Sequence, residues 1–244
     1  MRTRLLRLRL AMTLRASPNS VKIFVSSWRN HYGSFYSTER ESMNKQHFQK
    51  KTKKEIIITG FGGQGIILAG LVLGKAAALG DHKESTFVQS YGPESRGGAC
   101  SAQVVIADET IHYPYVRHPD ILVCMSQSGY EKFIDQINKE GILLIDQDLV
   151  SPFPKIKSNL FSIPATRMAE ELGRKMTANI IMLGFTIAVT NLVSLDAARA
   201  AVAESVPKGT EELNLNAFSK GCDYGLATLK GRQKKAAGLT GAIS

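Results

Sequence analysis

A glycine-rich turn at residues 60–65, Gly-Phe-Gly-Gly-Gln-Gly, constrains the fold of this chain more than any other feature. It follows the apolar run Ile56-Ile57-Ile58, which is typical of a strand buried on both faces. After it, residues 66–79 contain one charged side chain, Lys75, and predict a largely buried helix. This order is typical of α/β domains, because glycines permit the tight turn and the helix start presents N–H groups that attract phosphate.

The rest of the chain continues the alternation. Periodicity predicts further strands at 86–88, 102–106, 120–125, 141–146 and 159–163, and a short return at 111–113. It predicts helices at 128–137, 165–173, 178–191, 195–204 and 210–230, with Ser194 as an N-cap. We therefore expect an α/β fold: a mainly parallel sheet with flanking helices, a Rossmann-like glycine-rich first turn and a helical C-terminal part.

The positive charge of the chain is concentrated at its N-terminus. The formal net charge is +10, but residues 1–54 carry +11 and residues 55–244 carry −1. A nucleic-acid-binding domain needs a basic face on the fold itself, so we expect no nucleic-acid partner.

Residues 1–54 are interpreted as a basic, disordered extension. Their Arg-rich, acid-poor start fits a mitochondrial presequence. It also fits an over-extended start with Met43 as the true first residue, which is the interpretation we favour. We expect the α/β domain over 55–232 and a flexible tail over 233–244.

The cysteines and the longest uncharged run exclude two classes of protein. Cys100, Cys124 and Cys222 are too widely spaced for a zinc or iron–sulfur site, and their scatter fits buried thiols in a reducing cytoplasm. The 18 uncharged residues 176–193 approach the length of a membrane span. Polar residues interrupt this run, so we expect a buried or interface helix and no membrane contact.

Ordinary dinucleotide binding is disfavoured by the second predicted strand. Such folds place an Asp or Glu at the end of that strand to hold the ribose hydroxyls. Here the strand ends at Val88-Gln89-Ser90, and Asp81 and Glu84 precede it. A stand-alone flavin- or nicotinamide-binding protein remains the alternative hypothesis.

A second unusual loop spans residues 89–98, Gln-Ser-Tyr-Gly-Pro-Glu-Ser-Arg-Gly-Gly. Its Pro and Gly residues favour a fixed backbone that holds Glu94 and Arg96 at the carboxyl edge of the sheet, where α/β proteins bind ligands. Arg96 is suited to a phosphate or carboxylate. Alternatively, Glu94 and Arg96 pair with each other or with a neighbouring subunit.

Other polar residues fit structural roles at least as well as functional ones. His112 and His118 fit a surface hairpin, Ser126 fits a helix cap, and Asn179 fits a partnered core amide. We expect no catalytic residue and no metal ligand. The candidate binding residues are those of the two loops: Gly60, Gly62, Gly63, Gln64, Gly65, Ser90, Tyr91, Gly92, Glu94, Arg96, Gly97 and Gly98.

Three segments carry a resemblance to a known family. They are Thr59-Gly-Phe-Gly-Gly-Gln-Gly65, Gln89-Ser-Tyr-Gly-Pro-Glu-Ser-Arg-Gly-Gly98 and Ala178-Asn-Ile-Ile-Met-Leu-Gly184. Together they resemble the gamma subunit of 2-oxoacid:ferredoxin oxidoreductases, most of all the 2-oxoglutarate type. The similarity spans about residues 55–230, and residues 1–42 have no counterpart.

The resemblance implies a subunit of a cytoplasmic complex rather than a complete enzyme. Such complexes convert 2-oxoglutarate and coenzyme A to succinyl-coenzyme A and carbon dioxide and reduce ferredoxin. Thiamine diphosphate with Mg²⁺ belongs to the alpha and beta subunits, and iron–sulfur clusters belong to partners such as a ferredoxin-like delta subunit. This chain is expected to bind no cofactor alone. Our hypothesis is that its two loops face the alpha and beta subunits and help to form the coenzyme A side of the site. A purely structural subunit without any ligand is a further alternative.

Overall fold

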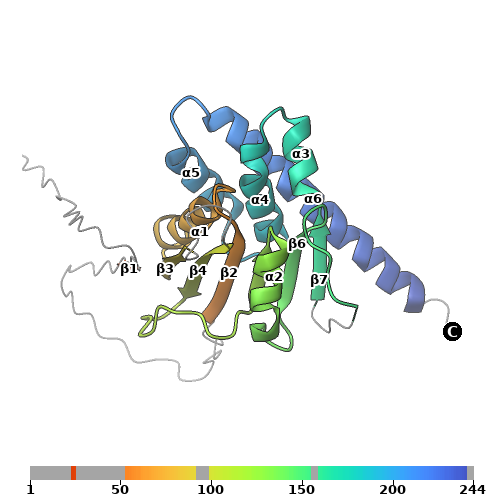
Figure 1. The fold of residues 1–244 in the computed structure, drawn as a ribbon, viewed down its shortest axis with the longest axis horizontal. Coiled ribbons are helices and arrows are strands. Elements are labelled where there is room, and N and C mark those ends of the chain that lie inside the picture. Colours follow the sequence, from red (N-terminus) through yellow and green to blue (C-terminus); the bar gives the residue numbers. More distant parts are fainter. Residues whose placement is uncertain (1–22, 26–52, 92–98, 155–158, 241–244) are drawn as a thin grey trace, which may run out of the picture.

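A central sheet organises the domain, with the strand order β1-β3-β4-β2-β5-β6-β7 (Figure 1). The computed structural model describes residues 23–25, 53–91, 99–154 and 159–240. The strands are β1 (Ile23–Val25), β2 (Lys53–Phe61), β3 (Glu84–Ser90), β4 (Ala99–Ala107), β5 (Ile121–Cys124), β6 (Ile142–Asp146) and β7 (Asn159–Ile163).

The sheet is mainly parallel, as the sequence predicts. Strands β2, β5, β6 and β7 are parallel neighbours, and β3 points in the same direction. Strand β4 runs the other way between β3 and β2. This reversal follows from the chain length, because the few residues between β3 and β4 permit an antiparallel return but no crossover helix.

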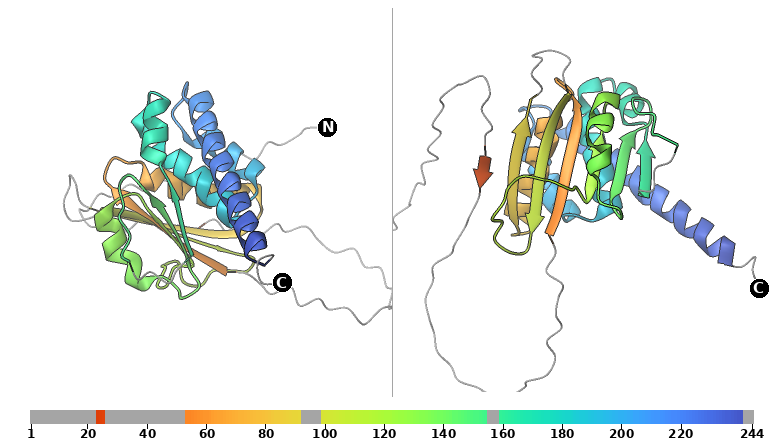
Figure 2. Two further views of the ribbon diagram at one scale, coloured as in Figure 1. Left: turned by 90° about the vertical axis from the view of Figure 1, so that its right-hand side faces the viewer. Right: turned by 60° about the horizontal axis from the view of Figure 1, so that its bottom comes forward.

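Helices cover both faces of the sheet unequally. They are α1 (Ile66–Lys75), α2 (Gln127–Phe133), α3 (Ala165–Glu171), α4 (Ala178–Thr190), α5 (Leu195–Ser205) and α6 (Glu211–Thr240). Helix α2 lies alone on one face, and the others lie on the opposite face (Figure 2). Ile56 and Ile58 join the core beneath the larger helical layer, and Ile57 joins the core beneath α2. The unbroken apolar run of β2 is therefore explained by burial on both faces.

Most predicted elements are confirmed, and the differences lie at the ends of elements and in one short segment. The helix predicted over 66–79 continues beyond α1 as a π-helical turn, Ala76–Gly80. The helix predicted over 128–137 ends with a 3-10 turn, Ile134–Gln136. The predicted return strand at 111–113 is wrong, because this segment is irregular. Ser194 caps α5 as predicted, its hydroxyl accepting from Ala197 N at 3.2 Å.

The ends of the domain differ from the expected boundaries where the structure describes them. Strand β2 begins at Lys53, and Ile23–Val25 pair with β3 as β1, although both fall in the segment expected to be disordered. Helix α6 runs to Thr240, into the segment expected to be a flexible tail. The remaining residues of both expected tails lie outside the described residues, so those expectations stay predictions.

Most of the uncharged run 176–193 forms helix α4, Ala178–Thr190. No helix among the described residues is long and apolar enough to cross a membrane. Every α4 residue from Ala178 to Ile187 is buried, beneath α6 among others. The expectation of a buried helix is confirmed.

Glycines allow α4 and α6 to approach until their backbones touch. A Cβ added at Gly184 would overlap the Phe218 carbonyl oxygen, and one added at Gly221 would overlap the Ile181 carbonyl oxygen. A Cβ at Gly225 would lie 2.9 Å from that of Ala188. Close backbone approach of this kind requires small residues at the crossing, and it sets the course of α6 across the domain.

We predict that Gly221→Ala destabilises the domain. The added methyl group meets backbone on α4, which cannot move aside, so the free energy of unfolding should fall by about 1–3 kcal/mol. Gly231→Ala on the same helix is the matched control. A Cβ there meets nothing within 4 Å, and the substitution should raise the free energy of unfolding by up to about 1 kcal/mol. Urea unfolding measures both, and equal stabilities of the two variants would contradict the packing argument.

Candidate functional site

The glycine-rich loop lies at the carboxyl end of β2 and leads directly into α1. Its glycines have different structural roles. Gly60 has no room for a side chain, because an added Cβ would lie 2.5 Å from Gln64 Oε1 and 2.6 Å from Ile66 Cδ1. Gly63 and Gly65 adopt positive φ angles of 93° and 75°, which favour glycine. Gly62 has neither constraint, and nothing lies within 4 Å of a Cβ added there. The loop is therefore open to an approaching group at Gly62 and Gly63.

Two side-chain amides hold the loop in place. Gln64 Oε1 accepts from Phe61 N at 2.6 Å, and Gln64 Nε2 donates to Met125 O at 3.0 Å, beyond the end of β5. Asn179 is buried at the start of α4, and its Nδ2 donates to Gly65 O at 3.0 Å. The prediction of a partnered core amide at Asn179 is confirmed. Both ends of the Gln64 amide are engaged within the chain, so Gln64 shapes the loop.

The loop can hold an anion through its backbone. The first turn of an α-helix has N–H groups without carbonyl partners, and its dipole favours negative charge. Helix α1 begins at Ile66, directly after Gly65, and has no acidic residue in its first turn. Strand β2 lies between β4 and β5 in the sheet. After β2 the chain forms β3 and β4 on one side of it and then β5, β6 and β7 on the other side, so the order of strands switches direction at β2. Ligands of open α/β sheets bind at such a point.

The second loop adjoins the first. Strand β4 starts at Ala99, which pairs with Phe61, while Cys100 pairs with Gly60. Ser90 ends β3 and is exposed together with Tyr91. The predicted binding residues Gly92, Glu94, Arg96, Gly97 and Gly98 lie outside the described residues. The structure thus brings the two ends of the second loop to the edge that carries the first.

Large apolar side chains are exposed at this edge. They are Phe61, which is 38% exposed, Tyr91 at 63%, Phe153 at 50% and Met176 at 68%. They come from the loop itself, the residue after β3, the segment after β6 and the 3-10 turn that precedes α4. Exposed apolar residues are ordinary when scattered, but several at one edge of a sheet are typical of a surface that another protein covers.

Other polar residues have structural partners. Ser126 caps α2 by accepting from Gly129 N at 3.1 Å, so the capping interpretation is confirmed. Asp81 accepts from Ser194 N at 2.7 Å and from Ser194 Oγ at 2.6 Å. Asp81 therefore orders the start of α5, and its carboxylate is not positioned to bind ribose hydroxyls. Glu84 begins β3 instead of ending it. The alternative of a stand-alone flavin- or nicotinamide-binding protein is not favoured.

Asp146 is a buried carboxylate at the end of β6 that the sequence analysis did not single out. It accepts from Thr166 N at 2.9 Å, from Thr166 Oγ1 at 2.6 Å and from Asp148 N at 3.1 Å. Burial raises the pKa of Asp146, and the hydrogen bonds from Thr166 and Asp148 oppose this rise. Its role is to fix the connection into α3. An Asp directly after an apolar strand and ahead of a Thr-containing helix start is the signal that could have identified it.

A separate hollow of about 530 Å³ lies at the opposite end of β2, beside Tyr113, Arg117 and His118. The Arg117 guanidinium lies 4.9 Å from the Tyr113 ring centre. The carboxylates of this hollow accept hydrogen bonds from other residues that line it. Asp120 accepts from Glu55 N at 2.9 Å, and Glu55 accepts from Arg117 N at 3.4 Å. These bonds hold an irregular segment together, so the glycine-rich loop is the better candidate site.

The described residues hold no group of three or more His, Cys, Asp or Glu arranged for a metal ion. Cys100, Cys124 and Cys222 are free thiols buried in separate places, as the sequence predicts. Burial raises the pKa of all three, that of Cys222 to about 11. These thiols are inert core residues, and the described donor set does not fit an iron–sulfur cluster or a diphosphate-bound Mg²⁺.

The fold and the loop define a class, the α/β domains that present a Rossmann-like glycine turn at the carboxyl edge of a mainly parallel sheet. The family described as "Pyruvate ferredoxin/flavodoxin oxidoreductase" matches residues 55–224. The chain belongs to this family, as a gamma-type subunit of a 2-oxoacid:ferredoxin oxidoreductase. The resemblance stated from the sequence is thereby confirmed.

Similar proteins specify this assignment. The 2-oxoglutarate synthase subunit KorC of Methanocaldococcus jannaschii is 54% identical over 182 residues, covering 73% of this chain and 96% of that protein. The gamma subunit of a keto/oxoacid ferredoxin oxidoreductase from Geobacter sulfurreducens is 38% identical with a TM-score of 0.64, covering 71% of this chain and 99% of that one. A 2-oxoglutarate:ferredoxin oxidoreductase from Magnetococcus marinus shares the fold, with a TM-score of 0.64 at 22% identity. The match covers 73% of this chain and 32% of that one.

We predict that Asn179→Asp loosens the glycine-rich loop. The substitution keeps the size of the side chain but replaces the donor to Gly65 O with a second oxygen that repels it. The free energy of unfolding should fall by about 1–3 kcal/mol in urea titrations at neutral pH. Asn216→Asp, at an exposed position of α6, is the control and should change it by less than about 0.5 kcal/mol. A stability equal to that of the wild type would show that the Asn179 amide does not brace the loop.

Proposed function

We propose that this chain is the gamma subunit of an enzyme that converts 2-oxoglutarate and coenzyme A to succinyl-coenzyme A and carbon dioxide with reduction of ferredoxin. The choice of 2-oxoglutarate is supported by the 54% identity to the 2-oxoglutarate synthase subunit of M. jannaschii. The partners in this proposal are alpha and beta subunits, a ferredoxin-like delta subunit and ferredoxin, in the cytoplasm.

The proposal gives this chain the coenzyme A side of the active site. The observation that carries it is the open backbone at Gly62 and Gly63, next to the unpartnered N–H groups that begin α1. Coenzyme A is an anionic ligand with a diphosphate, which suits such a helix start. The M. marinus enzyme that shares this fold was solved with coenzyme A and succinyl-coenzyme A bound, which is consistent with this choice of ligand.

The residues of this chain contribute binding, orientation and exclusion of water. Thiamine diphosphate in the partner subunits supplies the electron sink for decarboxylation. The backbone at Gly62 and Gly63 approaches the phosphates, because no side chain intervenes. Gln64 and Asn179 keep that backbone in one conformation, which lowers the entropy lost on binding. The exposed apolar residues Phe61, Tyr91 and Met176 are the surface that the partner subunits cover.

We predict that Gly62→Ala blocks coenzyme A without disturbing the fold. The new methyl group projects into open space at an ordinary φ angle, so the thermal midpoint should not change. In the assembled complex the KM for coenzyme A should rise by about tenfold or more, because each tenfold loss corresponds to only about 1.4 kcal/mol of lost contact. Gly231→Ala, which also meets open space but on α6, is the control. An unchanged KM for coenzyme A would remove the loop from the binding site.

Arg96→Ala tests the second loop, on the sequence-based hypothesis that Arg96 pairs with a phosphate. Losing a charge-assisted hydrogen bond should raise the KM for coenzyme A by about 10- to 100-fold while the subunits still assemble. Steady-state kinetics and size-exclusion chromatography of the same preparation measure the two effects. If only assembly suffers, the loop is structural and the Arg96 hypothesis fails.

A further inference from the structure

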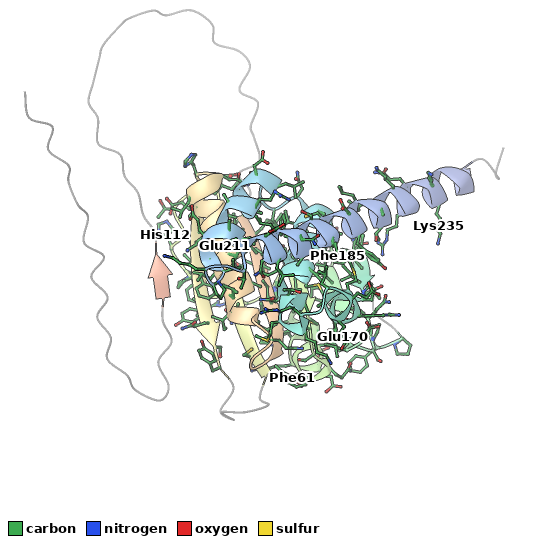
Figure 3. The ribbon with its side chains drawn as sticks, turned by 90° about the horizontal axis from the view of Figure 1, so that it is seen from above. Phe61, His112, Glu170, Phe185, Glu211 and Lys235 are labelled. Carbon is green, nitrogen blue, oxygen red and sulfur yellow. The ribbon has the colours of Figure 1, made fainter. Side chains whose placement is uncertain are left out.

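The C-terminal part of α6 extends beyond the rest of the domain. Figure 1 shows the helix passing the β7 end of the sheet, and Figure 3 shows Lys235 on the extended part, far from Glu211 at the start of the helix. We call residues 230–235 of this helix the basic arm. Four of these six residues are cationic: Lys230, Arg232, Lys234 and Lys235.

Charge is segregated between the basic arm and the domain. Residues 55–223 hold 14 Lys or Arg and 19 Asp or Glu, a net charge of −5. Residues 224–244 hold four cations and no acid. Cations near a helix end are stabilised by the helix dipole, but this effect is confined to the last turn. The basic arm precedes the last turn of a helix that runs to Thr240, so the dipole does not account for it.

One cation of the basic arm anchors it, and the other three are free to bind. The Arg232 guanidinium lies 3.6 Å from the centre of the Phe161 ring and donates to Leu160 O, both on β7. Lys230, Lys234 and Lys235 are exposed, and none of the ion pairs among the described residues includes them. Lys230 and Lys234 are four residues apart, a spacing at which like charges destabilise a free helix. An acidic surface that binds them removes this repulsion.

The chemistry of the basic arm favours a protein as its partner. A nucleic-acid backbone is repelled by negative charge, and residues 55–223, which carry the arm, have a net charge of −5. Membrane binding requires a broad apolar face. Among the α6 side chains that the structure describes, the large apolar residues next to the arm are Leu226 and Leu229, and Leu229 is partly buried against the core. A few cations on a narrow helix suit a local acidic patch on another protein.

The comparison with related proteins indicates why this chain needs such a contact. In the M. marinus enzyme the matching fold is about a third of one longer chain, so it is covalently joined to further protein. A covalent link provides a high effective concentration, which a separate subunit must replace by additional contacts. The family match ends at Tyr224, six residues before the basic arm. The arm therefore lies outside the residues that the family description matches.

We propose that the basic arm docks onto an acidic surface of a thiamine-diphosphate-binding partner subunit and holds this chain in the complex. The inference rests on the proposed function, since it requires that partner. The contact is electrostatic, lies away from the glycine-rich loop and weakens as salt screens it.

The test replaces Lys230, Lys234 and Lys235 together by Glu and leaves Arg232 in place. The matched control replaces three exposed lysines elsewhere, Lys139, Lys208 and Lys220, by Glu. Each full-length variant is titrated onto affinity-tagged, co-expressed thiamine-diphosphate-binding subunits between about 0.05 and about 0.5 M NaCl. Circular dichroism verifies that each variant is folded. If the Lys→Glu triple variant of the arm does not fold, a Lys→Gln triple variant at the same positions replaces it.

We expect the Lys→Glu triple variant of the arm to bind the tagged subunits about tenfold more weakly than the wild type at low salt. The salt dependence of its binding should also be smaller. The control variant should behave like the wild type. Equal losses in both triple variants would show that net charge and not the arm is responsible, and would overturn the proposal. So would an arm variant that binds as tightly as the wild type. If the wild-type chain itself does not bind the tagged subunits at any salt concentration, the proposed function fails.

Discussion

The candidate site depends on two hydrogen-bonding side-chain amides, the partly buried Gln64 and the buried Asn179, that hold a flexible backbone in one shape. The loop after β2 consists largely of glycine, which has the greatest conformational freedom of any residue. Gln64 joins this loop to the end of β5, and Asn179 joins it to the start of α4. The loop is therefore braced from the sheet below and from the helical layer beside it. Because the brace forms within the chain, the backbone is ordered before any ligand or partner arrives, which reduces the entropy lost on binding.

The same helical layer determines where the partner-facing surfaces lie. Gly184 and Gly221 allow α6 to rest directly on the backbone of α4, and this contact directs α6 past the β7 edge. Helix α4 thus positions two features. It holds the glycine-rich loop through Asn179, and it directs the basic arm through its contact with α6. A subunit without described metal ligands or catalytic groups can still serve a redox complex in this way. It supplies a rigid edge for a ligand and separate surfaces for its neighbours.

Much of the fold could be predicted because the deciding interactions are local or periodic. The wholly apolar residues of β2 indicate burial on both faces, and the structure has this arrangement. Ser194 is recognisable as a cap because its hydroxyl satisfies an N–H group only three residues away. The prediction of a strand at 111–113 is wrong, since a short run with apolar and aromatic residues resembles a strand when its neighbours are unknown. The site residues of the first loop were recognisable by glycine spacing between a strand and a helix, whereas the partners that brace them were not.

The order of elements, the glycine-rich turn, the scattered thiols and the family were predictable, because these features depend on residue type and short spacing. The contacts between residues far apart in the chain were not predictable in this way. Asp81 binds Ser194 across 113 positions, and Asn179 binds Gly65 across 114. The course of α6 past β7 was likewise decided by packing. The physical reason is that a hydrogen bond or a helix crossing between remote segments depends on the relative placement of whole elements, which no local pattern of residues encodes.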